Sequence, residues 1–144
     1  IVQGKVAEVR DFGSFVWLMV VSAGLGCVHV ATEKEQREAQ AHYDLAVNMA
    51  QKEPQGALVE LERALTLDPD FPEAHNAKGV LLHMAFARPE EAIGSYKKAL
   101  ELKPTFSECK VNLGNVYLDQ KRYDDAIVLY REALNDILQR LERL

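Results

Sequence analysis

The chain has 144 residues, of which 48% are apolar and 27% are charged, and its formal net charge is −5. This composition is ordinary for a single globular domain and excludes a disordered chain. The acidic balance disfavours nucleic acid as a partner, because binding to phosphates requires a clustered basic surface.

Residues 1–27 have the organisation of an export signal. No Asp, Glu, Lys or Arg occurs across residues 12–31, Arg10 stands just before this apolar run, and small residues lead to Cys27. A basic start, an apolar run and small residues before the cleavage point are typical of exported proteins. With a cysteine directly after Gly26, the segment resembles a bacterial lipoprotein signal. This resemblance implies that the thiol of Cys27 carries a lipid anchor.

Two other interpretations of the apolar run stay open. It has roughly the 20 residues that can span a bilayer, so an uncleaved transmembrane anchor is the main alternative. The third interpretation is a buried helix of a soluble protein. The first two place the rest of the chain at a membrane surface or outside the cytoplasm, which in a bacterium is the periplasm, where disulfides can form. We interpret Cys109, the other cysteine of the chain, as a packing residue.

The remaining residues predict an all-α fold. Thr32 and Glu35 form a capping box, which predicts a helix from there to about Gln51, with residues 28–40 as a linker and the start of that helix. Further helix ends are marked by Pro54, Gly56, Pro69, Pro72, Pro89 and Pro104. The last helix should extend almost to the terminus with an apolar face that includes Ile137, Leu138, Leu141 and Leu144.

The helices repeat with a period close to 34 residues. The clearest unit is residues 107–134, a helix-turn-helix with an apolar stripe on each helix, formed by Leu113, Gly114 and Tyr117 and by Ala126, Ile127, Tyr130, Ala133 and Leu134. Two earlier copies carry alanine at the matching positions Ala57, Ala64, Ala92 and Ala99. Small residues at these places let two helices approach closely and interlock.

These residues resemble the tetratricopeptide repeat, in which a small residue, two alanines and a proline recur at fixed positions. The resemblance covers three repeats, at residues 41–69, 72–104 and 107–138, followed by an extension of the last helix at 139–144. It implies a solenoid of antiparallel helix pairs whose concave surface is lined by the first helix of each repeat. Such a groove binds an extended or helical segment of another protein.

The inward-facing positions of the family give the predicted groove. They are Tyr43, Val47 and Ala50 in the first repeat, Asn76, Val80, His83 and Met84 in the second, and Val111, Asn115, Leu118 and Asp119 in the third. Val80, Asn115 and Leu118 are the central candidates. The amide of Asn115 can pair with the backbone of a bound peptide through its donor and its acceptor, or it can bond the neighbouring repeat. The lining lacks the lysines and arginines by which chaperone-binding members hold a terminal carboxylate, so a co-chaperone role is disfavoured.

The apolar face of the last helix requires a cover. A terminal repeat of a solenoid normally has a polar outer surface, whereas the final eight residues, ILQRLERL, are nearly half apolar. Further repeats, a second copy of the chain or a partner protein could provide the cover. The alternative is that Leu141 and Leu144 simply fray.

The sequence carries no recognisable catalytic or metal-binding pattern. The four histidines, His29, His42, His75 and His83, do not have the spacing of metal ligands. We find neither a nucleophile elbow nor a glycine-rich phosphate loop. The sequence therefore predicts a protein that is not an enzyme and that uses no metal, cofactor or small-molecule substrate.

A lipoprotein signal followed by these repeats resembles the pilotin family, the outer-membrane lipoproteins that assist assembly of the secretin channel of type IV pili. The resemblance implies a protein-binding scaffold on the outer membrane, facing the periplasm, whose groove engages a secretin subunit. Two alternatives remain. One is a membrane-anchored periplasmic scaffold of another envelope complex, and the other is a soluble cytosolic adaptor built from the same repeats.

Overall fold

The computed structural model describes residues 6–12, 15–20 and 28–144, with side chains from His29 onward. Three strands come first, β1 (Val6–Phe12), β2 (Phe15–Val20) and β3 (Val28–Val30). Six helices follow, α1 (Glu33–Met49), α2 (Pro54–Leu67), α3 (Pro72–Met84), α4 (Pro89–Leu102), α5 (Ser107–Asp119) and α6 (Tyr123–Glu142). Proline occupies the first helical position of α2, α3 and α4, where its missing N–H costs no hydrogen bond.

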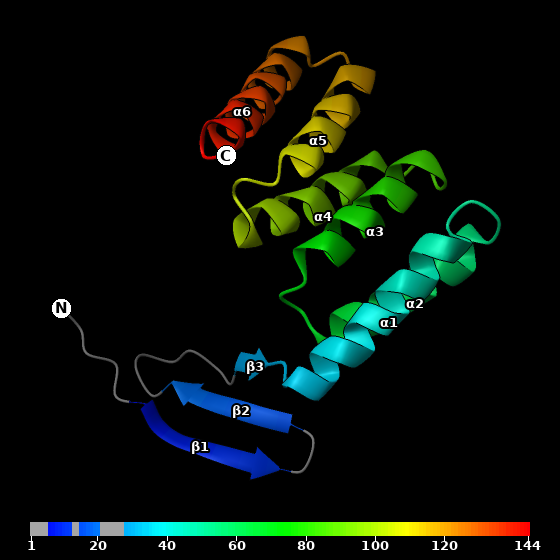
Figure 1. The fold of residues 1–144 in the computed structure, drawn as a ribbon. Helices are drawn as coiled ribbons and strands as arrows, with labels where there is room; N and C mark the ends of the chain where they lie inside the picture. Colours follow the sequence, from blue (N-terminus) through cyan, green and yellow to red (C-terminus); the bar gives the residue numbers. More distant parts are fainter. Residues whose placement is uncertain (1–5, 13–14, 21–27) are drawn as a thin grey trace.

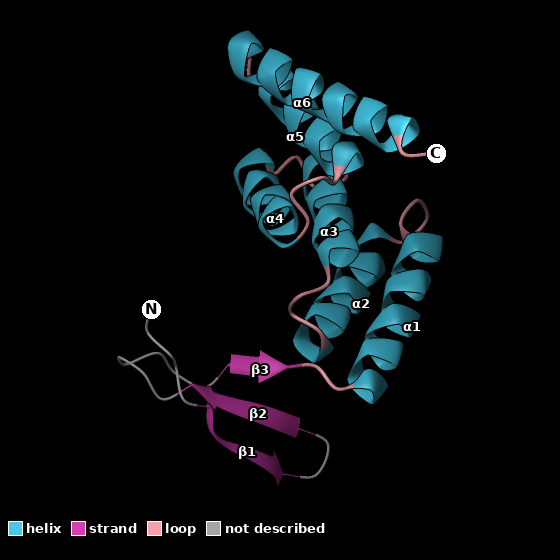
Figure 2. Cartoon of the chain, turned by 60° about the vertical axis from the view of Figure 1, so that its left-hand side comes forward, coloured by secondary structure: helices cyan, strands magenta, loops and turns pink. Residues whose placement is uncertain are grey.

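The six helices form three pairs that stack one after another, α1 with α2, α3 with α4, and α5 with α6 (Figure 1). α3 packs on α2 and α5 packs on α4, so the second helix of each pair contacts the first helix of the next pair. The predicted solenoid of helix pairs is confirmed. Figure 2 shows the strands beside the start of α1, at the opposite end of the stack from α6.

β1 and β2 lie in the segment for which the sequence predicts an export signal or a membrane anchor. β1 and β2 pair in antiparallel register with Val9 opposite Leu18, and β3 adds to β2 with Trp17 opposite His29. The sequence FVWLMV of β2 is rich in β-branched and aromatic residues, which favour a strand. Cys27 lies outside the described residues, and its lipidation stays a prediction. Among the residues that the structure describes, no helix is long and apolar enough to cross a membrane.

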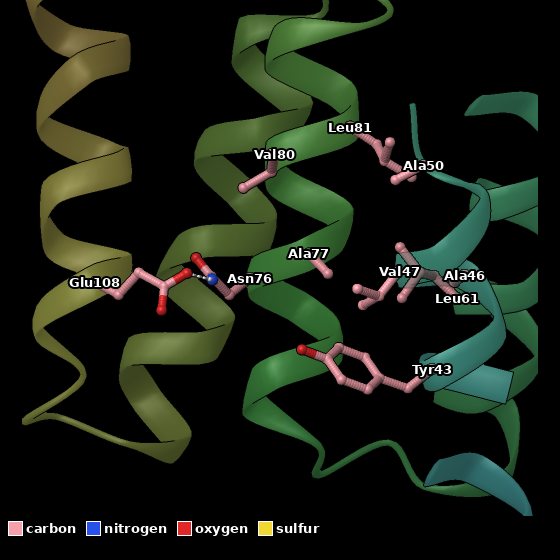
Figure 3. Close-up of a pocket in the computed structure, with 10 residues that line it drawn as sticks. All are labelled: Tyr43, Ala46, Val47, Ala50, Leu61, Asn76, Ala77, Val80, Leu81 and Glu108. Carbon is pink, nitrogen blue, oxygen red and sulfur yellow. Dashed lines mark hydrogen bonds between the residues drawn. The ribbon is translucent and has the colours of Figure 1, made fainter. Parts of the chain in front are cut away.

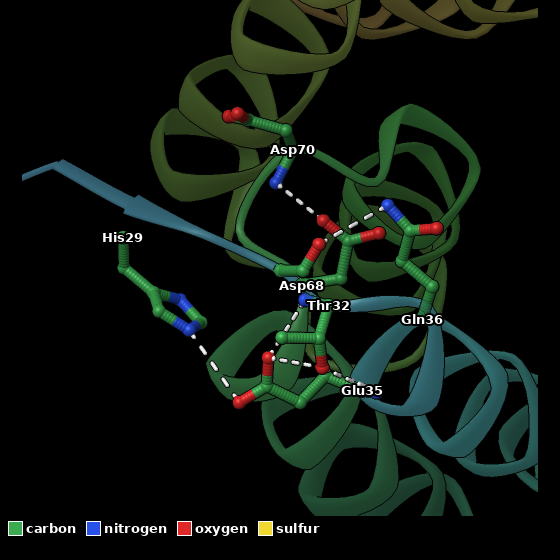
Figure 4. Close-up of polar contacts among 7 residues, drawn as sticks. His29, Thr32, Glu35, Gln36, Asp68 and Asp70 are labelled. Atoms are coloured by element: carbon green, nitrogen blue, oxygen red, sulfur yellow. Dashed lines mark hydrogen bonds and ion pairs between the residues drawn. The ribbon is translucent and has the colours of Figure 1, made fainter. Parts of the chain in front are cut away.

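The predicted capping box at the start of α1 is confirmed (Figure 4). The backbone N–H of Glu35 donates to the Thr32 hydroxyl at 3.3 Å, and the backbone N–H of Thr32 donates to the Glu35 carboxylate at 2.8 Å. The backbone hydrogen bond from Thr32 lowers the pKa of Glu35. His29 Nε2 lies 3.5 Å from the same carboxylate, so Glu35 links β3 to the first turn of α1.

Small residues set the distance between the helices of each pair. The alanines at the repeated positions are at most 2% exposed: Ala57, Ala64, Ala92, Ala99, Ala126 and Ala133. Gly79 of α3 lies under the ring of Tyr96 of α4, and a Cβ at Gly79 would come within 2.6 Å of that ring. Gly114 of α5 lies under Tyr130 of α6 in the same way. Close packing of the pair therefore depends on the absence of a side chain at these two glycines.

The turns inside the second and third repeats have the same construction. Ala87 and Lys121 adopt left-handed backbone conformations, with φ of 52° and 61°, in the turns that follow α3 and α5. The next residue in each repeat is an arginine whose side chain pairs with an acidic residue in the first turn of the following helix, as Arg88 with Glu91 and Arg122 with Asp125. These acidic residues therefore stabilise the start of a helix, where their negative charge also interacts favourably with the positive end of the helix macrodipole.

The predicted burial of the apolar stripe on α6 is wrong for its outer face. Ile127 and Leu134 are 45% and 57% exposed, although both belong to the apolar face of the repeat. Ile93, at the position of α4 that matches Ile127, is 8% exposed because it packs in one cluster with residues of α5. No described helix covers α6 in the way that α5 covers α4. Leu138 and Leu141 continue this exposed face toward the end of the helix.

We predict opposite effects of alanine at two glycines of the second repeat. Gly79→Ala should lower the free energy of unfolding by about 1–3 kcal/mol, because its Cβ would overlap the buried Tyr96 ring. Gly94→Ala in α4 should raise it by about 0.5–1 kcal/mol, because no atom lies within 4 Å of the added Cβ and alanine favours the helix. Urea denaturation followed by circular dichroism measures both. Equal effects would contradict the proposed contact.

We also predict that two matching isoleucines differ in their tolerance of charge. Ile93→Glu should cost about 3 kcal/mol or more, because it buries a carboxylate against α5. Ile127→Glu should change the stability by less than about 0.5 kcal/mol, because its side chain is exposed to water. The melting temperatures of the two variants provide the test. A similar loss in both would show that α6 is covered in solution.

Candidate protein-binding groove

A pocket opens between α1 and α3, the first helices of the first two repeats (Figure 3). Its volume is about 250 Å³. Its lining comes from α1, α2, α3 and α5 and consists of Tyr43, Ala46, Val47, Ala50, Leu61, Asn76, Ala77, Val80, Leu81 and Glu108. The pocket is therefore apolar except at one end, where α5 contributes a carboxylate.

The apolar part of the pocket spans the contact between the first two repeats. Val47 of α1 faces α3 and is 52% exposed, and Val80 of α3 is half-buried. The Tyr43 ring extends from α1 toward α3 and packs against Phe71, with ring centroids 5.1 Å apart. Phe71 occupies the N-cap position of α3, so its contact with Tyr43 holds the start of α3 against α1.

A row of hydrogen bonds forms the polar end of the pocket. The side-chain amide of Asn112 donates to Asn76 Oδ1 at 3.1 Å, and the amide of Asn76 donates to Glu108 Oε1 at 3.4 Å. Asn76 is only 6% exposed, so its amide is held in one orientation by partners from α5. These bonds join the second and third repeats, and the Glu108 side chain extends from α5 toward Asn76 of α3 (Figure 3).

Five of the predicted groove residues line this pocket, namely Tyr43, Val47, Ala50, Asn76 and Val80. The six others do not line it: His83, Met84, Val111, Asn115, Leu118 and Asp119. Val111, Leu118 and Met84 are exposed, with Met84 75% accessible. His83 Nε2 lies 2.8 Å from Asp119 Oδ2, which ties the end of α3 to the end of α5.

Asn115 bonds the second helix of its own repeat. Its Oδ1 accepts a hydrogen bond of 2.7 Å from the hydroxyl of Tyr130. The acceptor is therefore not bonded to the neighbouring repeat, and contact of Asn115 with a bound peptide stays a prediction. The inter-repeat asparagine is Asn76, and its partners Asn112 and Glu108 were absent from the predicted groove. Asn112 lies 36 residues after Asn76, whereas the repeat period is close to 34 residues, so matching equivalent positions of the repeats does not identify the pair.

The groove is acidic at its polar end. Burial raises the pKa of the Tyr43 hydroxyl, and the negative charges of Glu108, Glu73 and Asp44 raise it further. Glu73 pairs with Lys103 Nζ at 2.8 Å. Glu108 bonds only the neutral amide of Asn76 in the described part of the chain. A bound segment therefore meets an uncompensated carboxylate beside an apolar pocket.

The remaining chemistry-bearing side chains have structural contacts. Cys109 is fully buried, its thiol donates to the carbonyl of Tyr96 at 3.4 Å, and burial raises its pKa to about 12, which suppresses the reactive thiolate. His42 bonds Glu60 at 2.6 Å and His75 bonds the carbonyl of Pro69 at 2.8 Å. Within the described residues, no three His, Cys, Asp or Glu side chains are grouped to hold a metal ion.

Comparison with solved structures finds the same arrangement of helices. A crystal structure of MamA superposes with a TM-score of 0.68 at 25% identity, over 73% of this chain and 61% of that chain. A second MamA structure gives 0.64 at 25% identity, over 73% and 57%. A structure from the functional characterisation of Pseudomonas aeruginosa PilF gives 0.68 at 29% identity, over 74% and 48%. The chain thus spans about half to three fifths of these proteins.

A search of curated proteins finds no match. Two sequence profiles of the tetratricopeptide repeat do match, one over residues 47–105 and the other over residues 83–143. Together they cover the stacked helix pairs from the end of α1 to the end of α6. Residues 47–143 of this chain therefore belong to the tetratricopeptide repeat family.

Proposed function

We propose that this chain is a protein-binding scaffold of the bacterial envelope, and that its α1–α3–α5 groove holds a secretin subunit during assembly of type IV pili. A tetratricopeptide fold implies a protein–protein interaction scaffold, and no catalytic family is indicated. The observation that carries the proposal is the open apolar pocket between α1 and α3.

The pocket suits side chains of a protein segment better than a free small molecule. Its volume of about 250 Å³ lies below the range of about 300–1,000 Å³ that is usual for small-molecule sites. Its walls come from successive repeats, so the groove continues past the pocket toward α5. A segment that lies along the groove can insert one or two apolar side chains and leave its backbone on the open side.

The envelope part of the proposal rests on the sequence before residue 28 and on a structural likeness. The apolar run that ends at Cys27 has the composition of a lipoprotein signal. The similarity to PilF, a pilus-related protein with tetratricopeptide repeats, supports a role beside the secretin. The chain covers 48% of PilF, so any activity of the longer protein enters here only as a proposal.

A second candidate is an adaptor without a lipid anchor, either for another envelope complex or in the cytosol. The observation that favours it is the antiparallel sheet of β1, β2 and β3. These strands include apolar residues that an export signal would use in a helix. The groove chemistry is the same in both candidates, so they differ only in where the groove is displayed.

We predict that apolar groove residues are required for partner binding. The double variant Val47→Ser/Val80→Ser should keep its helical circular dichroism yet lose a secretin subunit from a pull-down with envelope extract. Loss of central apolar contacts should weaken binding by about 2 kcal/mol or more, roughly 30-fold. Val59→Ser in α2 is the matched control, because Val59 is 48% exposed and lies outside the pocket. Retention of the subunit by the double variant contradicts the groove, and its absence from the wild-type pull-down contradicts the pilus role.

We further predict that Cys27 is the mature N-terminus and carries a diacylglyceryl group. The reason is its place after small residues at the end of the apolar run. Mass spectrometry of the protein extracted from membranes measures the modification directly, and Cys27→Ser should move the protein to the soluble fraction. Recovery of an intact chain that still contains Trp17 would favour the adaptor or a transmembrane anchor.

A further inference from the structure

The proposed function does not say which side chains the bound segment carries, and the polar end of the pocket indicates one of them. Resting on that function, we propose that the groove selects a segment in which a lysine or arginine lies within one helical turn of a large apolar side chain. The apolar side chain enters the pocket between Val47 and Val80. The cation pairs with the Glu108 carboxylate.

Glu108 carries this selectivity because it lines the pocket without a cationic partner. Its direct contact is the Asn76 amide, which donates to Oε1 at 3.4 Å, a long hydrogen bond, and Oε2 has no hydrogen-bond partner among the described residues. Asn112 holds Asn76 from the other side at 3.1 Å. One neutral amide therefore contacts the carboxylate, and a second amide holds the first in place. Glu108 has no charged partner among the described residues, so a cation from a ligand would be its first.

The charges around this end of the groove reinforce Glu108. The carboxylate of Asp44 on α1 accepts a hydrogen bond from the neutral side-chain amide of Gln40 and has no cationic partner among the described residues. Glu73 on α3 already pairs with Lys103 at 2.8 Å and contributes less. The N-terminus of α5 is adjacent to Glu108 and opposes it with a partial positive charge of about half a unit. The full charges of Glu108 and Asp44 exceed this partial charge, so the local field remains negative.

The order of groups along the groove sets the spacing of the ligand. Tyr43, Asn76 and Glu108 lie at one end of the pocket, whereas Val80, Ala50 and Leu81 lie toward the other (Figure 3). One continuous segment therefore meets the carboxylate and the apolar wall through neighbouring side chains on one of its faces. In a helix these are three or four residues apart, and in an extended strand they are two apart.

A randomised library of 12-residue peptides displayed on phage provides the probe. The full chain is the bait, and clones that also bind Val47→Ser/Val80→Ser are removed, so the remaining clones depend on the pocket. We expect these clones to carry Lys or Arg within four residues of Leu, Ile, Phe or Met. A synthetic peptide from the strongest clone and its Lys→Gln counterpart are then compared by fluorescence polarisation.

The variant Glu108→Gln keeps an acceptor for Asn76 and removes only the charge. It should weaken the cationic peptide about two- to fivefold, the range of partly exposed ion pairs, and leave the Lys→Gln peptide unchanged. The cationic peptide should also weaken with added salt, whereas the neutral peptide should not. Glu101→Gln is the matched control, because Glu101 is exposed on α4, lies outside the pocket and carries the same charge.

The outcomes separate this inference from the function on which it rests. Pocket-dependent peptides that lack a cation, or an equal effect of Glu108→Gln on both peptides, would overturn the charge selectivity and leave the protein-binding groove intact. Recovery of no pocket-dependent clone would count against the groove itself and therefore against both proposals. A loss with Glu101→Gln as large as that with Glu108→Gln would assign the effect to net charge and overturn the assignment to Glu108.

Discussion

The close approach of the two helices in each repeat is the contact on which the rest of the structure depends. In the second and third repeats a glycine of the first helix lies directly under a tyrosine ring of the second, at Gly79 with Tyr96 and at Gly114 with Tyr130. In the first repeat Ala46 and Leu61 occupy the matching positions and are almost fully buried. The small residue brings the two helices together. Tyr96 also packs in one cluster with residues of α5, and its backbone carbonyl accepts a hydrogen bond from the buried thiol of Cys109.

This arrangement decides which surface is available for binding. The second helices use their apolar faces to hold the next repeat, as α4 does with α5. The first helices are left with a free inner face, and only part of that face is apolar. The pocket between α1 and α3 is closed at one end by Asn76, whose two partners come from the third repeat. Three repeats therefore contribute to one site, and its polarity comes from the contact between the second repeat and the third.

The two ends of the stack differ in the polarity of their exposed helix faces. At the first end, Glu35 joins the start of α1 to His29 of β3, and the exposed residues of α1 are mainly polar. At the other end, α6 presents Ile127 and Leu134 at the positions where α4 has Ile93 and Leu100, which pack with residues of α5. Leu138 continues this exposed face of α6. The exposed face of α1 is thus mainly polar, whereas the exposed face of α6 is apolar. α6 keeps the apolar pattern of its repeat although no described helix covers it.

Local sequence pattern determined most of the helical part of the fold. The spacing of apolar residues, the capping box at Thr32 and Glu35, and the recurring alanines predict six helices in three pairs, and these features depend on residues within one or two helical turns of each other. The resemblance to the tetratricopeptide repeat predicted that Tyr43, Val47 and Val80 line the groove, and all three line the pocket. Such information is local, because a buried stripe shows which face of a helix is apolar.

Only the tertiary structure decided what each face meets. The same stripe is covered at Ile93 and exposed at Ile127, since coverage depends on a neighbouring helix and not on the stripe itself. Asn115 bonds Tyr130 in its own repeat, while Asn76, Asn112 and Glu108 meet across separations of 32 and 36 residues that the twist of the stack sets. The strands before β3 likewise depend on pairing between segments, which the apolar composition of the run does not reveal. The sequence by itself thus determined the repeat and its inner face, and the packing between repeats determined the charge and shape of the site.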